Sequence, residues 1–530
     1  MLWPDRKPTL LLSVLCLPAL LPGAEDVSSI TLENALRKAL LNQPVLEIQE
    51  ELAAQREGIL LEESGAFDWF FRGEVRHGFE RTPLSATARQ RRLQQGGTGV
   101  TEVRDFETHW TEYSGFIGSL FRTGVSTDAS VSFQREDVRT IDPDPPVNQS
   151  VITLGLTIPL LQGLGREATG ALERAARLEW EASQQEIVLV ASEVTRDTAS
   201  AYWQALFAAR VVALREDARQ RARDLLENIE QLVEADERPR SEIGPTRAFV
   251  SEQEVELLQA RSQEQTARRN FGRSLGLKTD GLTEIPIPVT DFPSPTDLTG
   301  ELENLSHWLH LAKEQRADLQ GSRIQEKSAM ALRRGARSDL KTRLDLRLEA
   351  SYAQVSENSA GGSLLTPFRS RQTGPGAFAI LEMDWPFENR EARGRLRQSQ
   401  ARYRQSTWRS EDLRREINTS VASLFHTLQS NVHEITQASQ TVELYEESLR
   451  NELERFQMGM ATIFDIVQTQ DRLTSAELFF LDRQRDYAEN LARLRFAIGD
   501  LVEKHGQDLQ LDARKLLEGP QSNPSSSPSP

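Results

Sequence analysis

The sequence predicts a mainly α-helical protein with a smaller membrane-type β-structure, built as one helix–strand–strand–long-helix–helix unit that occurs twice. Residues 159–276 and 386–499 follow the same plan. Each begins with a proline at the end of an alternating run and continues through about seventy residues of helical pattern. After a turn, each copy ends in a hydrophobic residue and a glycine, Leu275-Gly276 and Ile498-Gly499. A heptad pattern in the long helices and a two-residue period before them complete the argument.

The N-terminus has the pattern of a secretory signal over residues 1–24. Arg6 and Lys7 precede an apolar stretch that is too short to span a membrane, and Pro22 to Ala24 form the expected cleavage region. The one cysteine, Cys16, lies inside this segment, so the mature chain is expected to have no disulfide. The whole chain carries −16 and the signal carries +1, which leaves −17. That acidity argues against nucleic-acid binding.

The first copy is expected to begin with a helix over residues 30–64, which Pro44 interrupts. Strands are then expected within about residues 67–158, beginning with the alternating segment from Phe67 to Phe79. Residues 82–109 are polar and Gly-rich and are expected to form a mobile loop. Residues 112–135 have a hairpin-like pattern that leaves the number of strands in this copy open.

The second copy carries its strands within about residues 343–386. Leu344 to Tyr352 and Ala377 to Trp385 alternate apolar with polar side chains, around a Gly/Ser/Pro-rich loop. One apolar and one charged face is what a lipid-facing wall around a water-filled lumen requires. A soluble two-sided sheet is the alternative interpretation of the strands alone.

The long helices are expected over about residues 166–237 and 389–457, and both hold a heptad seam for many turns. Apolar and small residues recur at alternating steps of four and three. The first seam runs through Ile187, Ala191, Val194, Thr198, Ala201, Ala205, Ala208, Val212, Arg215, Arg219, Ala222, Leu226, Ile229 and Val233. The second runs through Ile417, Val421, Leu424, Leu428, Asn431, Ile435, Ala438, Val442, Tyr445, Leu449, Glu452 and Phe456. Helices of this length must pack side by side as a column.

These patterns divide the chain after the signal. Residues 25–276 form the first repeat, 277–300 a proline-rich linker, and 301–499 the second repeat. Residues 500–530 are expected to form a polar tail with a Ser/Pro-rich, disordered end.

The segment from Phe456 to Gln470, with its Gly turn and its Asp-Ile-Val-Gln sequence, resembles the TolC-like outer-membrane efflux proteins. Ala201-Tyr202-Trp203 and Thr157 to Leu161 are also similar to that family. The resemblance implies a homotrimer in which each protomer lends four strands to one outer-membrane β-barrel, continued by a periplasmic α-helical barrel. The first turn, Glu234 to Ile243, departs from the family pattern because it has no glycine at the expected place. Aspartate can adopt the left-handed conformation at some cost, and a first tip of different shape is the alternative.

What the resemblance implies is a passive exit duct in the cell outer membrane that extends into the periplasm. Its partners would be a periplasmic adaptor, an inner-membrane transporter and outer-membrane lipid. A type I conduit for polypeptides is a second interpretation within transport, and a secreted coiled-coil structural protein is a third from another class. The exported substrate stays open.

The candidate functional residues lie at the two helix–turn–helix tips, where an adaptor would dock. They are Arg238, Pro239, Arg240 and Ser241 in the first tip and Gly459, Met460, Ala461 and Thr462 in the second. Glu443, Glu447 and Glu452 are candidates for acidic rings that constrict a threefold pore. His307 and His310 have helical spacing, but no ligand cluster completes a metal site. No catalytic motif is present, so the sequence predicts no enzyme and no cofactor.

Overall fold

The computed structural model describes residues 29–95, 106–139, 146–277, 285–295, 305–357, 373–505 and 508–517. The predicted signal, residues 1–24, lies outside these residues. The chain divides into two units. The helical unit comprises Met1–Ala54, Glu181–Arg323 and Trp408–Pro530, and the sheet unit comprises Gln55–Trp180 and Ile324–Thr407. Both units draw on both repeats, so spatial and sequence divisions differ.

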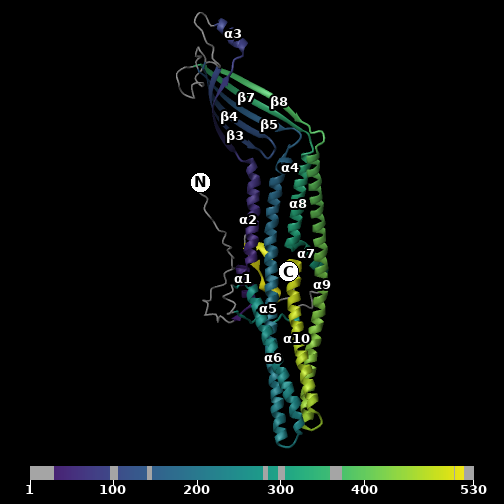
Figure 1. Ribbon diagram of the computed structural model, residues 1–530. Coiled ribbons are helices and arrows are strands. Elements are labelled where there is room, and N and C mark those ends of the chain that lie inside the picture. The colour runs from purple at the N-terminus through teal and green to yellow at the C-terminus, as the bar shows by residue number, and fades with distance from the viewer. Residues whose placement is uncertain are drawn as a thin grey trace, which may run out of the picture. The chain divides into compact units, whose positions relative to one another are not determined.

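The helices follow the predicted repeat (Figure 1). In each copy two consecutive helices precede the strands, and a long helix with a shorter partner follows them. The break before Pro44 falls where the sequence predicts it, because a helix accommodates proline in its first turn but not in its interior. The principal helices are α1 (Leu32–Asn42), α2 (Pro44–Ser64), α5 (Ala171–Glu234), α6 (Ile243–Ser274), α7 (Leu305–Gln315), α8 (Ala317–Ser338), α9 (Arg390–Gln457) and α10 (Ile463–Ile498).

The helical unit packs along the two predicted seams, whose members are buried or half-buried throughout. Polar groups interrupt the second seam at Asn431, which is 5% exposed. Its Oδ1 accepts a hydrogen bond at 3.0 Å from Nδ2 of Asn490 on α10. This amide pair fixes the register of α9 against α10, since a sliding helix would leave a buried amide unpaired.

Tyr202 and Trp203 form the centre of the largest apolar cluster, and both are fully buried. The Tyr202 hydroxyl donates to the Ile30 carbonyl at 3.1 Å and accepts from the backbone N–H groups of Val289 and Thr290. It thereby holds together the parallel pair β1 (Ser29–Ile30) and β6 (Ile287–Pro288). Burial raises the pKa of this hydroxyl above its ordinary value.

Two glycines in left-handed conformation end the shorter helices at equivalent places. Gly276 has φ +69° and Gly499 has φ +80°. Gly276 lies against Asn42, and the Gln43 side chain donates to the carbonyls of Arg273 and Ser274. Gly499 lies against Arg316, whose guanidinium donates to the Ala497 carbonyl. In both repeats, therefore, the C-terminal end of the shorter helix packs against a helix break. The end of α6 contacts the break between α1 and α2, and the end of α10 contacts the break between α7 and α8.

The sheet unit contains six antiparallel strands in the order β2-β3-β4-β5-β7-β8 (Figure 1). Each pair of neighbouring strands runs in continuous register over most of the length of both strands. The strands are β2 (Phe70–Thr82), β3 (Phe106–Leu120), β4 (Ser126–Arg139), β5 (Val147–Pro159), β7 (Arg343–Glu357) and β8 (Thr373–Asp384). Among the described residues, the first repeat thus contributes four strands to this sheet, because the segment with the hairpin-like pattern at residues 112–135 enters the sheet between β2 and β5. The resemblance implied four strands from the whole chain.

Other segments also differ from expectation. The predicted loop 82–109 contains α3 (Ala86–Gln95), rich in the helix formers Ala, Arg and Gln. In the predicted linker, Ile285 and Phe292 are buried. Within the predicted polar tail, β9 (Val502–His505) pairs antiparallel with β10 (Asp508–Leu511), and a short 3-10 helix, Ala513–Leu516, follows. Five apolar side chains of this segment are buried, although its overall composition is polar: Leu501, Val502, Leu509, Ala513 and Leu516.

Candidate channel wall and docking turns

The strand register places apolar side chains on one face of the sheet. Because Phe71 pairs with Ile117 and successive residues alternate between faces, one row of partners fixes the face of every residue. Large side chains on this face stay exposed in the single chain, including Phe71 at 75% and Leu381 at 63%. The large apolar side chains on this face include Phe71, Val75, Phe79, Tyr113, Ile117, Val131, Phe133, Ile152, Leu154, Leu348, Tyr352, Leu381 and Met383. The same face carries Arg81, Glu107, His109, Arg135 and Asp137, near the end of β2, the start of β3 and the end of β4. Such a surface is unsuited to water and suited to lipid.

The opposite face is polar and carries cross-strand charge pairs. Arg347 of β7 lies 3.7 Å from Asp128 of β4, and the Asp128 carboxylate lies over Gly155 of β5, where a Cβ would be 2.5 Å away. Aromatic or aliphatic exceptions on this face include Phe70, Trp110, Phe116, Leu120, Val138, Val151, Val355, Phe378 and Ile380. Its polar members are Arg72, Glu74, Arg76, Glu112, Asp128, Ser130, Ser132, Gln134, Arg347, Glu349 and Glu382. This face matches a water-filled lumen.

The two outer strands of the sheet, β2 and β8, each pair on one side only among the described residues. An unpaired strand edge exposes N–H and C=O groups that lipid cannot satisfy. A sheet with one lipid-type face and two open edges is therefore incomplete as a single chain.

A buried carboxylate connects the β3–β4 turn of the sheet to the start of α5. Glu173, at the start of α5, accepts two hydrogen bonds from Arg122 of the β3–β4 turn, at 2.7 and 2.8 Å. The Arg122 guanidinium lowers the pKa of the Glu173 carboxyl below its ordinary value. The contact joins the inserted hairpin to the long helix of its own repeat.

The two helix–turn–helix tips close their long helices by the same hydrogen bonds. In the first tip, Asp236 N–H donates to Val233 O and Glu237 N–H to Leu232 O. In the second, Gly459 N–H donates to Phe456 O and Met460 N–H to Arg455 O. Asp236 has φ +62° and Gly459 has φ +73°, so the aspartate occupies the glycine place, as the sequence suggests.

Arg238, a predicted docking residue, joins the two tips to each other. Its guanidinium donates to the Phe456 carbonyl at 2.9 Å and lies 4.2 Å from the centre of the Phe456 ring. Ala461 is also turned inward, with 6% exposure. Of the predicted residues, Pro239, Arg240, Ser241, Gly459, Met460 and Thr462 are exposed.

The second tip presents an apolar surface that the sequence analysis identified only in part. Met458, Met460 and Phe464 are 61%, 59% and 69% exposed. Ile463 and Ile466 are buried on the inner side of α10, whereas the neighbouring Phe464 points outward. An aromatic residue in the first turn of a helix, outside the spacing of the buried residues, is the sequence pattern that could have identified this surface.

The three acidic candidates on α9 differ in setting. Glu443 and Glu447, one helical turn apart, are exposed. Glu452 lies at a seam position and forms an ion pair with Arg455 at 3.0 Å. Only the first two present free carboxylates of the kind that a pore constriction uses.

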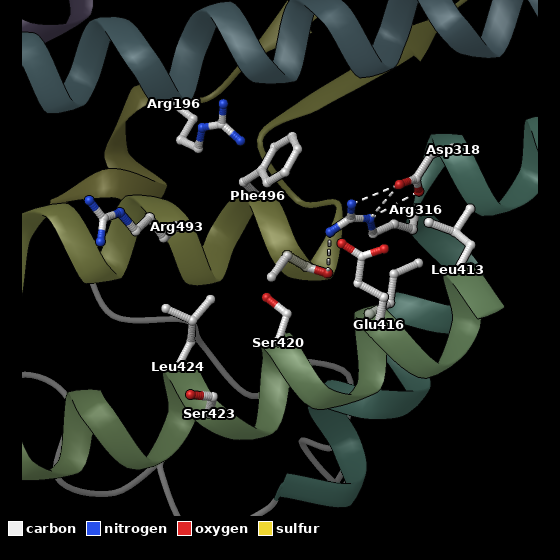
Figure 2. Close-up of a pocket in the computed structure, with 12 residues that line it drawn as sticks. Arg196, Arg316, Asp318, Leu413, Glu416, Ser420, Ser423, Leu424, Arg493 and Phe496 are labelled. Atoms are coloured by element: carbon white, nitrogen blue, oxygen red, sulfur yellow. Dashed lines mark hydrogen bonds and ion pairs between the residues drawn. The ribbon is translucent and has the colours of Figure 1, made fainter.

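A cavity of about 480 Å³ lies in the helical unit beside the contact between Gly499 and Arg316, here called the Gly499 joint (Figure 2). Arg196 and Arg316 both approach the ring of Phe496, with guanidinium carbons 4.4 and 4.8 Å from its centre. Arg316 is itself held by two oxygens of Asp318. With its cations already engaged, the cavity is best explained as part of the joint.

Among the described residues, no group of three His, Cys, Asp or Glu side chains is arranged to hold a metal ion. His310 lies 3.6 Å from Glu314, and His307 stacks edge-on against Trp308. None of the described helices combines the length and the apolar composition that crossing a membrane requires.

Comparison with solved structures identifies the fold. The chain is similar to the outer-membrane channel OprN, with 13% identity, a TM-score of 0.61, and coverage of 88% of this chain and 90% of that one. It is also similar to VceC of Vibrio cholerae, with 16% identity, a TM-score of 0.60, and coverage of 88% and 96%. For the outer membrane channel CmeC of Campylobacter jejuni the values are 13%, 0.59, 93% and 95%. A comparison with curated protein sequences found no match.

The chain therefore has the fold of these outer-membrane channels. Residues 308–500 match the family model described as "Outer membrane efflux protein". This match covers the second repeat and agrees with the resemblance to the TolC-like family inferred from the Phe456–Gln470 segment.

Proposed function

We propose that three copies of this chain form a passive efflux duct in the outer membrane. The observation that carries this proposal is the continuous register that puts lipid-type side chains over most of one face of the sheet and a mainly polar, charged surface on the other. Pairing of β2 of one copy with β8 of the next removes every open edge. The helical unit would then extend the passage into the periplasm.

The inserted hairpin of β3 and β4 makes this wall wider than the resemblance implies. Three sheets of six strands would give eighteen strands in place of twelve. Because barrel diameter grows roughly in proportion to strand number, a wider mouth follows. The duct carries no chemistry of its own in this proposal, and the energy would come from an inner-membrane transporter.

The experiment that tests the duct is single-channel recording of the purified protein in a planar lipid bilayer. We expect ohmic, cation-selective steps from a preparation whose mass is that of a trimer. A verified trimer without conductance would overturn the proposal.

The acidic positions sharpen the same measurement. We propose that Glu443 and Glu447 form acidic rings at the narrow end of the passage. Substituting both with glutamine should lower the preference for cations, because threefold symmetry multiplies each lost charge by three. Glu452→Gln serves as the matched control, since that carboxylate is already paired with Arg455. Equal selectivity in all three proteins would exclude the rings.

We further propose that a periplasmic adaptor docks on the exposed residues of the two tips. The charged first tip and the methionine-rich second tip offer a partner two different surfaces, and methionine adapts readily to a contact surface. A photo-crosslinking amino acid at Met460 should capture an adaptor in intact cells. The same group at Leu258, which is 65% exposed on α6, should not. Capture at both positions alike would contradict tip docking.

A further inference from the structure

The junction where β8 leads into α9 differs from the rest of the chain in charge. The protein carries a net −16. Residues 333–343 and 385–404, both in the sheet unit, contain eleven basic and three acidic side chains. A concentration of positive charge beside an apolar sheet face is the arrangement that attracts acidic lipid headgroups.

Two aromatic rings continue the apolar face beyond the last strand. Trp385 follows β8 with the same parity as Leu381 and Met383. It is 61% exposed and stacks on Phe387, which is 90% exposed, with ring centres 5.8 Å apart. Exposed tryptophan at the edge of an apolar band is typical of the boundary between hydrocarbon and headgroups.

A cavity of about 270 Å³ lies directly beside these rings. Leu340 and Thr342 line it from the turn before β7, and Trp385, Phe387, Asn389 and Arg393 line it from the chain after β8. Asn389, with φ +43°, donates from its side chain to the Leu340 carbonyl at 3.4 Å and so connects the two segments.

Arg393 is the cation that faces this cavity. The acidic side chains around it have other partners: Glu388 pairs with Arg390 at 2.8 Å, and Glu391 pairs with Arg395. The exposed Arg393 guanidinium therefore retains its capacity for an anion, and guanidinium binds phosphate oxygens in a bidentate manner.

We propose that this junction is a binding site for the phosphate headgroup of a membrane phospholipid. Arg393 binds the phosphate oxygens, and Trp385 and Phe387 lie against the first part of the acyl chains. The assignment rests on the proposed membrane position of the sheet. It adds a specific ligand and a specific depth, because headgroups at Arg393 place the boundary of the hydrocarbon at Trp385.

The test uses the purified full-length trimer in detergent, titrated with dihexanoyl-phosphatidylglycerol and followed by native mass spectrometry. We expect Arg393→Gln to weaken lipid binding about tenfold, the loss typical of a hydrogen bond to a charged group. Arg393→Lys should retain part of the affinity. Arg414→Gln removes the same charge from an exposed position further along α9 and should bind as the original protein does. Equal affinities in Arg393→Gln and Arg414→Gln would overturn the site.

Two further arms identify the source of the phosphate and protect the test from a folding artefact. Inorganic phosphate should not displace the lipid, and Trp385→Ala should weaken lipid binding while leaving the trimer intact. Displacement by phosphate, together with unchanged binding in Trp385→Ala, would overturn the lipid assignment in favour of free phosphate. Conductance recorded on the same preparations separates the two proposals. A conducting trimer with unaltered lipid binding in Arg393→Gln refutes this site alone, whereas a non-conducting trimer refutes the duct.

Discussion

The turn between α5 and α6 and the turn between α9 and α10 make the same two closing hydrogen bonds with different residues. The second uses Gly459 and a capping box, in which Thr462 and Asp465 exchange side-chain and backbone hydrogen bonds. The first uses Asp236 and needs a short 3-10 helix, Arg240–Glu242, before α6 begins. Equal backbone geometry can thus carry unequal surfaces, charged on one tip and apolar on the other.

The largest expected effect comes from the glycines at the opposite ends of these hairpins. A Cβ at residue 276 would lie 2.5 Å from the Asn42 carbonyl oxygen, and one at 499 would lie 2.9 Å from the Arg316 backbone. Gly276→Ala and Gly499→Ala should each cost about 3 kcal/mol, from the left-handed backbone and the displaced neighbour together. Thermal unfolding followed by circular dichroism measures the loss.

Gly459→Ala is the matched control for this prediction. Its φ is also positive, but nothing lies within 4 Å of the added methyl group, so only the backbone term of about 1–2 kcal/mol applies. Similar losses at 276 and 459 would show that the joint is not closely packed.

Arg238→Ala should follow in size, because it removes the contact between the two tips. We expect a loss of about 1–2 kcal/mol from the hydrogen bond to the Phe456 carbonyl and the cation–π contact. Arg240→Ala, at an exposed neighbouring position, should be close to neutral in the same thermal assay. A neutral Arg238→Ala would mean that the tips are held independently.

Thr462→Ala tests the capping box that only the second tip has. Loss of the cap should cost about 1 kcal/mol. Hydrogen bonds from the Thr462 side chain and backbone lower the pKa of Asp465 below its ordinary 3.8. A lowered pKa stabilises the fold above the ordinary value and loses that effect as pH falls through the folded-state value. The difference between the variant and the original protein, measured by urea unfolding, should therefore shrink below about pH 3.8. A difference that is constant down to pH 2 would refute the role of the carboxylate.

Asp236→Gly should produce the smallest change, and in the opposite direction. Removing the side chain relieves the left-handed conformation, a gain of about 0.5–1 kcal/mol after the entropy of glycine is counted. A loss in thermal stability would show that the aspartate side chain stabilises the first tip by contacts of its own.

Local patterns in the sequence predicted the parts of the fold that local physics decides. Pro44 marks a helix break, the seams specify packed faces, and the alternation from Phe71 onward specifies a two-faced strand. The number of strands was not predictable in this way, since the place of β3 and β4 depends on pairing with β2 and β5 far along the chain. The burial of Leu516 was not predictable from local composition for the same reason, because the residues it packs against are distant in the sequence.

The candidate functional residues could be located from the sequence only where the backbone conformation dictates them. The positions of both turns followed from Gly459 and from the Asp236 segment. Sequence could not show that Arg238 faces Phe456, because that contact joins residues more than two hundred positions apart. Nor could it separate Glu452 from Glu447, whose difference is a matter of which side of α9 meets a neighbour.

The amide pair of Asn431 and Asn490 limits how the α9–α10 hairpin can move. A displacement along the common helix axis would leave the buried Asn431 amide without this partner, whereas a roll or tilt about the pair keeps it joined. In the proposed duct, any widening at the tips would therefore require each α9–α10 hairpin to tilt about this amide pair as one unit, with the two helices keeping their register.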